Sequence, residues 1–125
     1  MIYPNVDYTG DSPSIQENGT GFLLEQSKIK WYFEHYFANN EDQVAVSPLF
    51  GPITADLPST LIITAGCDPL RDEGEAYAQA LNDAGVFVKH HPFEHMIHAF
   101  MNLEDLVPDE CKHLYQLIGN FIQDN

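Results

Sequence analysis

The sequence predicts an α/β fold in which parallel strands are joined by a crossover helix. Residues 60–65 form a short apolar run rich in β-branched residues, without the alternation of a half-exposed strand, as expected for a strand buried on both faces. A second strand is expected over residues 86–91, and apolar residues at helical spacing lie between the two. A strand–helix–strand unit of this kind makes its strands parallel, with a right-handed crossover. We therefore expect a three-layer αβα arrangement, with helices on the faces of a parallel sheet.

The first half of the chain contributes few regular elements to this prediction. Residues 1–4 read as the end of a strand that Pro4 terminates, and residues 5–20 as a polar loop interrupted by glycine and proline. A helix is expected over residues 24–37, and its aromatic residues cover more than one face. Such a helix either packs on two sides or lines a pocket. Residues 39–59 form a long connection, which indicates a functional or interface loop.

The second half is more regular. Gly66 is expected to end the first strand, and Asp72 to cap the following helix, with Glu75 completing a capping box. Gly85 is expected at the C′ position of that helix. Pro92 should end the second strand, a loop should cover residues 93–105, and the last helix should start near Asp109.

Length, charge and cysteine content limit the class of protein. The 125 residues are enough for one domain, and 19 acidic residues against 5 lysines and arginines leave a net charge of −14. This charge argues against binding to nucleic acid or to anionic membrane surfaces. No stretch approaches the roughly 20 apolar residues of a membrane span. Cys67 and Cys111 do not form a metal-spaced pair, so we expect free thiols in a reducing compartment, the cytoplasm.

Asp68 and His98 are the candidate catalytic residues. Asp68 comes just after the first strand, and His98 lies in the loop after the second, so both should meet at the carboxyl edge of the sheet. A carboxylate beside an imidazole fixes the tautomer of the ring and stabilises its protonated form. The alternatives are a turn residue before Pro69 and a solvated loop histidine.

Several segments resemble the hormone-sensitive-lipase-like esterases, a branch of the α/β-hydrolases. Residues 66–74, Gly-Cys-Asp-Pro-Leu-Arg-Asp-Glu-Gly, resemble the acid segment of that family, and residues 95–100 resemble its histidine loop. Weaker similarities, in the same order as in the family, lie at residues 2–4, 17–19 and 47–49. The resemblance implies that residues 1–125 are a partial domain, the C-terminal part of an α/β-hydrolase fold with an incomplete sheet. It also implies that Asp68 is the triad acid and His98 the general base.

The chain departs from the family pattern at two positions. The family usually has glycine where this chain has His95 and Ala99; the alanine matters only if the backbone there needs a positive φ. His95 is the alternative to His98 as the base, but the Met-Ile spacing before His98 matches the motif. His90 and His91 are expected to alternate across a strand as structural or surface residues, without a clear set of metal ligands.

No serine of the chain fits the nucleophile. A triad hydrolase places it on a G-x-S-x-G turn between strand and helix, and this sequence has none. Ser12 lies in the most similar segment, but Pro13 has no N–H for an oxyanion hole and no amphipathic helix is expected to follow. Ser47 is likewise followed by Pro48. We expect the nucleophile to lie upstream of the segment at residues 2–4, in sequence that this chain does not contain.

The resemblance implies a carboxylic ester hydrolase, an esterase or lipase that acts on small-molecule esters without a metal or organic cofactor. The chain alone is expected to be inactive. The alternatives are a non-catalytic fragment or interaction module that reuses the fold, and a hydrolase of the same fold that acts on amides or peptides. Because the incomplete sheet should leave an unpaired edge, the chain is also expected to form a homo-oligomer.

Overall fold

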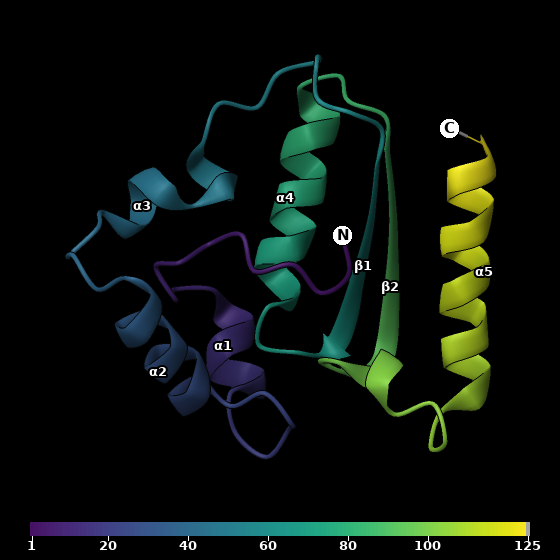
Figure 1. Ribbon diagram of the computed structural model, residues 1–125, viewed down its shortest axis with the longest axis horizontal. Helices are drawn as coiled ribbons and strands as arrows, with labels where there is room; N and C mark the ends of the chain where they lie inside the picture. Colours follow the sequence, from purple (N-terminus) through teal and green to yellow (C-terminus); the bar gives the residue numbers. More distant parts are fainter. Residues whose placement is uncertain (125) are drawn as a thin grey trace.

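The computed structural model describes residues 1–124 and shows a parallel sheet between two long helices (Figure 1). The sheet contains β1, Thr60–Cys67, and β2, Val88–Ile97, which pair in parallel. Helix α4, Arg71–Asp83, connects them on one face, and α5, Pro108–Asp124, lies on the other. The α/β class and the three-layer order predicted from the sequence are thus confirmed.

Alternation along β1 divides the core between the two faces. Leu61, Ile63 and Ala65 pack toward Cys111 and Leu114 of α5. Ile62 points the other way, into a cluster with Ala78 and Leu81 of α4. All the members of β1 from Leu61 to Ala65 are buried, which explains why this run carries no polar alternation.

The segment at the start of the chain lies along the other edge of β1. Ile2 forms a parallel bridge with Ile63, and the N–H of Tyr3 donates to the carbonyl of Ile63 at 2.9 Å. The spatial order is therefore residues 1–3, then β1, then β2. Residues 1–4 were expected to be the end of a strand, and the structure confirms this to the extent of one bridge between Ile2 and Ile63.

The connection between Pro4 and β1 contains four short elements beside the sheet (Figure 1). They are α1, Pro13–Asn18; α2, Gln26–Tyr36; α3, Gln43–Val46; and the 3-10 turn η1, Pro48–Phe50. The helix expected over residues 24–37 is confirmed with slightly shorter bounds. The loop expected over residues 5–20 is wrong in part, because α1 forms within it. Pro13 at its first position suits a helix start, but six residues are too few to show a periodic pattern.

Two further boundaries differ from the sequence prediction. Helix α4 begins at Arg71 with Leu70 as N-cap, so the predicted capping box of Asp72 and Glu75 is wrong; Asp72 lies in the first turn and binds other partners. Strand β2 continues through Pro92 to Ile97, although Pro92 was expected to end it. Pro92 is tolerated because, within residues 1–124, no further strand pairs with the outer edge of β2.

The C-terminal end of α4 forms as predicted. Gly85 has a φ of +88°, and its N–H donates to the carbonyl of Asn82, while the N–H of Val86 donates to the carbonyl of Leu81. This pair of hydrogen bonds is the Schellman motif, which requires the left-handed conformation that glycine adopts without strain. After β2, the 3-10 turn η2, Phe100–Asn102, leads into α5.

Candidate active site

The candidate site lies at the carboxyl edge of the sheet. Asp68 directly follows β1 and His98 directly follows β2, and the parallel pairing of these strands brings the two residues together across 30 positions of sequence. Nδ1 of His98 lies 2.8 Å from Oδ2 of Asp68. The side chain of Asp68 is only 1% exposed, whereas that of His98 is 24% exposed. A buried carboxylate thus holds one nitrogen of a partly accessible ring.

The second ring nitrogen of His98, Nε2, has no hydrogen-bond partner among residues 1–124. Because the Asp68 carboxylate accepts at Nδ1, the neutral ring carries its proton on Nδ1 and has a lone pair on Nε2. That lone pair is the feature a general base needs.

The other histidines near the site have different surroundings. His95 is exposed and makes no contact with Asp68. Nε2 of His90 lies 2.9 Å from Oγ1 of Thr64, and burial lowers the pKa of His90. The ring of His91 contacts Phe93 and His113 on the opposite face. His90 and His91 therefore alternate across the sheet, as predicted.

The ring of Tyr3 contacts the His98 ring, and the backbone that follows His98 has an unusual conformation. The ring of Tyr3 lies 5.1 Å from that of His98 between centroids, and its hydroxyl accepts a hydrogen bond of 3.0 Å from the N–H of Met101. Burial raises the pKa of Tyr3. Ala99 has a φ of 60° and a ψ of 23°, the left-handed region, so the backbone after His98 does adopt the conformation that favours glycine.

The residues that follow Asp68 in the acid segment each have a defined contact. The N–H of Leu70 donates to Oδ1 of Asp68 at 2.8 Å. The guanidinium of Arg71 donates to the carbonyl of Gly66 at 3.0 Å and to Glu17 and Asp72. This set of contacts fixes the turn that carries Asp68 to the end of β1 and to α1.

Two contacts of this region could not be predicted from the sequence. Asn18 and Ser14 of α1 donate to backbone carbonyls of the turn that carries Asp68. Glu73 is 1% exposed, and its Oε1 accepts from the side chain of Asn5 and from the N–H groups of Val6 and Asp7. Two signals in the sequence lie at α1: Ser12-Pro13 followed by Gly19, a helix start and a helix end, and the weak similarity of residues 17–19 to the family.

Among the described residues, the serine hydroxyls lie elsewhere than at the His98 ring. Ser12 precedes the six-residue helix α1 as its N-cap, in a region where no amphipathic helix was expected, and Pro13 lacks the N–H that an oxyanion hole requires. The hydroxyl of Ser14 donates to the carbonyl of Pro69, and that of Ser47 donates to the carbonyl of Gln43. Within residues 1–124, no serine is bonded to Nε2 of His98.

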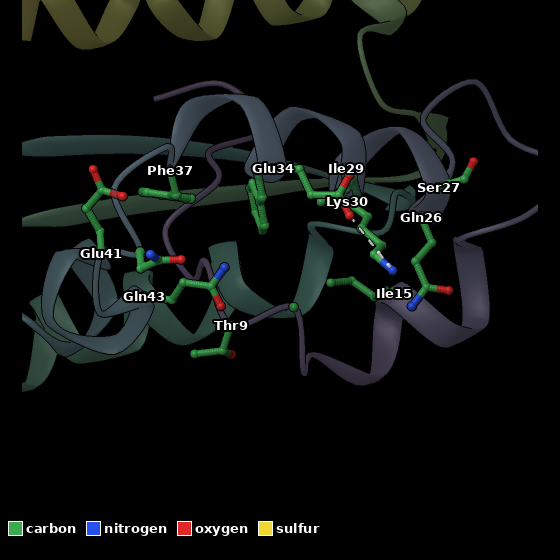
Figure 2. A pocket seen from close by; sticks show the side chains of 13 residues that line it. Thr9, Ile15, Gln26, Ser27, Ile29, Lys30, Glu34, Phe37, Glu41 and Gln43 are labelled. Atoms are coloured by element: carbon green, nitrogen blue, oxygen red, sulfur yellow. Dashed lines mark ion pairs between the residues drawn. The ribbon is translucent and has the colours of Figure 1, made fainter.

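A cavity of about 850 Å³ lies beside α2 and is separate from this pair in its lining. Figure 2 shows it between α1 and α2, with Ile15 on one side and Phe37 on the other. Its apolar wall is formed by Ile15, Ile29, Phe33 and Phe37, and neither Asp68 nor His98 lines it. Trp31, Tyr32 and Tyr36 of α2 remain exposed, so only part of this aromatic helix lines the cavity.

The described residues contain neither a cluster of metal ligands nor a helix that could span a membrane. Among residues 1–124, no group of three or more histidine, cysteine, aspartate or glutamate residues is placed to hold a metal ion. No helix in the same part of the chain has the length and apolar character to cross a membrane.

Comparison with known proteins identifies the family. A family model for the alpha/beta hydrolase fold matches residues 1–102, and the chain belongs to this family. The chain is 33% identical over 120 residues to an ethyl acetate hydrolase from Pseudomonas putida, covering 94% of this chain and 38% of the relative. It is 38% identical over 109 residues to the carboxylic ester hydrolase LipN from Mycobacterium tuberculosis, covering 85% and 29%.

Solved structures agree with the sequence relatives. The esterase of the archaeon Pyrobaculum calidifontis superposes with a TM-score of 0.84 at 33% identity, over 93% of this chain and 39% of that protein. The resemblance to the hormone-sensitive-lipase-like esterases is confirmed, and these relatives are ester hydrolases. The chain spans less than two fifths of the length of these relatives.

Proposed function

We propose that this chain is the acid- and base-bearing part of a carboxylic ester hydrolase that acts through a Ser–His–Asp triad in the complete protein. The observation that carries the proposal is the 2.8 Å contact between Nδ1 of His98 and Oδ2 of Asp68, with Nε2 left free. In this arrangement Asp68 is the triad acid and His98 the general base. The named activities of the relatives supply the reaction type.

The roles of the two residues follow from their surroundings. Nε2 of His98 takes the proton of the attacking serine hydroxyl, and the ester carbonyl is attacked to form an acyl-enzyme. His98 then returns that proton to the leaving alcohol, and its ring later activates the water that releases the acid. Asp68 keeps its charge throughout and stabilises the protonated ring. Neither a metal nor an organic cofactor takes part in these steps.

The substrate in this proposal is a small ester. One relative is named as an ethyl acetate hydrolase and another, from Saccharolobus solfataricus, as an arylesterase. We propose that the aromatic helix α2 and residues 39–59 shape the acyl or alcohol side of the substrate pocket. Ile29, Phe33 and Phe37 of α2 supply apolar surface for such a pocket, although the cavity that they line in Figure 2 is not lined by Asp68 or His98.

A chimeric enzyme tests the proposal. The part of the Pseudomonas putida ethyl acetate hydrolase that precedes the matched region is joined to this chain, and hydrolysis of p-nitrophenyl acetate is measured. We expect turnover that His98→Ala lowers by roughly 10³-fold or more, because removing one triad member disables the whole unit. His95→Ala is the matched control and should retain activity. A folded chimera in which His98→Ala is harmless would refute the role of His98.

The chain by itself should not hydrolyse p-nitrophenyl acetate above the rate of its His98→Ala variant. The reason is the absence of a serine on Nε2 of His98 among the described residues. Turnover well above the variant, or labelling of Ser12 by a fluorophosphonate, would show that the serine assignment is wrong.

The absence of an elbow serine from this sequence also supports a second candidate, a non-catalytic interaction module that reuses the fold. A well-folded chimera without activity toward any ester would favour this candidate. A panel of esters, amides and peptides on the same chimera separates an esterase from an amidase of the same fold.

We also propose a reducing compartment, the cytoplasm, because Cys67 and Cys111 are both free thiols. Mass spectrometry of the native protein after thiol blocking checks this. The homo-oligomer expected for this chain is likewise a proposal, and its test is given in the Discussion.

A further inference from the structure

Side chains of the short helix α1 form hydrogen bonds to the backbone of the turn that carries Asp68. Both hydrogens of the Asn18 side-chain amide face carbonyls of this turn: Nδ2 lies 3.3 Å from the oxygen of Gly66 and 3.3 Å from the oxygen of Asp68. Since both partners are acceptors, the amide must present its nitrogen, not its oxygen, to them. Asn18 is only 5% exposed, so water does not readily replace these bonds.

Helix α1 is itself fixed to the start of α4 at several points. The hydroxyl of Ser14 donates to the carbonyl of Pro69 at 2.6 Å, and its N–H donates to Oδ2 of Asp72 at 2.8 Å. Near the other end of α1, Glu17 pairs with Arg71 at 2.7 Å. The position of Asn18 relative to the turn is therefore set by contacts that do not involve His98.

The backbone of the turn controls where the Asp68 carboxylate points. Its Oδ1 accepts the N–H of Leu70, so the carboxylate rotates together with the peptides at residues 68–70. Movement of these peptides would turn Oδ2 away from Nδ1 of His98. Side chains of α1 donate hydrogen bonds to the carbonyls of Gly66, Asp68 and Pro69. These carbonyls come before, at and after residue 68 in the sequence, so α1 restrains the backbone on both sides of it.

We propose that Asn18 is a positioning residue for the triad, which acts through the Asp68 turn to keep His98 in the tautomer with the proton on Nδ1. This role rests on the proposed function, since it concerns the same Asp68–His98 pair. It predicts that loss of the Asn18 amide loosens the pair even where the fold survives.

The tautomer of His98 can be measured in this chain without any ester substrate. Nitrogen-15 NMR of the neutral ring, at about pH 8.5, distinguishes a proton on Nδ1 from one on Nε2. For Asn18→Ala we expect the ratio of the Nδ1–H to the Nε2–H form to fall roughly fivefold, as for loss of one ordinary hydrogen bond. Asn18→Asp, which keeps the shape but removes the donors, should do the same. Asp68→Ala is the positive control, and Asn120→Ala, at an exposed asparagine of α5, is the matched negative control.

Each outcome separates this inference from the proposed function. An unchanged tautomer in Asn18→Ala, with a shift in Asp68→Ala, overturns the positioning role and leaves the pair intact. If the tautomer ratio changes in neither Asn18→Ala nor Asp68→Ala, Asp68 does not set the tautomer of His98, and both proposals are overturned. An equal shift in Asn120→Ala shows a non-specific effect and overturns the role of Asn18.

If the Asn18 variants do not fold, hydrogen exchange in the wild-type chain tests whether the Asn18 amide is bonded as proposed. Its Asn18 side-chain amide should exchange with deuterium at least roughly tenfold more slowly than that of exposed Asn120, because it is buried and bonded. Equal exchange rates would overturn the proposal.

Discussion

Glu73→Gln should remove a specific pH dependence from the stability of this protein. The Glu73 carboxyl is almost fully buried, one of its oxygens accepts three hydrogen bonds from residues 5–7, and the other, Oε2, is buried without a partner. Burial raises the pKa of Glu73 from 4.5 to about 7, although those hydrogen bonds lower it in part. The nearby charge of Asp7 adds to the rise.

The sign of the effect follows from proton binding. A carboxyl whose pKa is higher in the folded state holds its proton more tightly there, so its stabilising effect is complete below pH 4.5 and is lost as the pH rises through 7. One tenfold change in affinity is 1.36 kcal/mol, so the wild type should lose about 2–3 kcal/mol between pH 5 and pH 8 through this group alone. The glutamine variant cannot titrate and should not show this loss.

Urea unfolding at the two pH values measures the difference. We compare the wild type with Glu73→Gln at each pH, so that all the other titrating groups cancel. Glu75→Gln is the matched control, because Glu75 lies on the same helix but is exposed. If the wild type and Glu73→Gln change stability in parallel from pH 5 to pH 8, the argument from burial is refuted.

Three further predictions concern the backbone and the surface. Ala99→Gly should raise the free energy of unfolding by about 1 kcal/mol in urea denaturation, because a left-handed residue with a Cβ is strained; an unchanged or lower stability would contradict this. Gly66→Ala should destabilise by about 2 kcal/mol or more, since its Cβ would overlap the backbone carbonyl of Glu94; Gly119→Ala, in open space on α5, is the control and should be neutral or stabilising. The chain should self-associate in 0.15 M salt through the open edge of residues 1–3 and the apolar hollow beside Met1, Ile2 and Phe121. Light scattering should show a dimer or larger assembly that Ile2→Asp dissociates, and a wild-type monomer would show that this edge does not recruit a second copy.

The sequence by itself determined the strand–helix–strand unit and the place of the candidate site. A largely apolar β1, a helix ended by Gly85 and a second strand are local patterns, and they can be recognised without knowledge of distant contacts. Because parallel strands end at one edge, the same patterns bring Asp68 and His98 together. The resemblance of residues 66–74 to the acid segment of the esterase family pointed to Asp68 in particular.

Only the tertiary structure decided how that edge is supported. Helix α1 is too short to have a periodic pattern, and its contacts with the Asp68 turn join residues about 50 positions apart. The burial of Glu73 depends on partners 66–68 positions away, which no local propensity encodes. Pro92 remains in β2 because no strand of residues 1–124 pairs with the outer edge of β2, and Ala99 adopts a left-handed conformation because the turn after His98 requires it. Local sequence specifies what each segment prefers, whereas these four features arise when packing and hydrogen bonds between distant segments override or complete that preference.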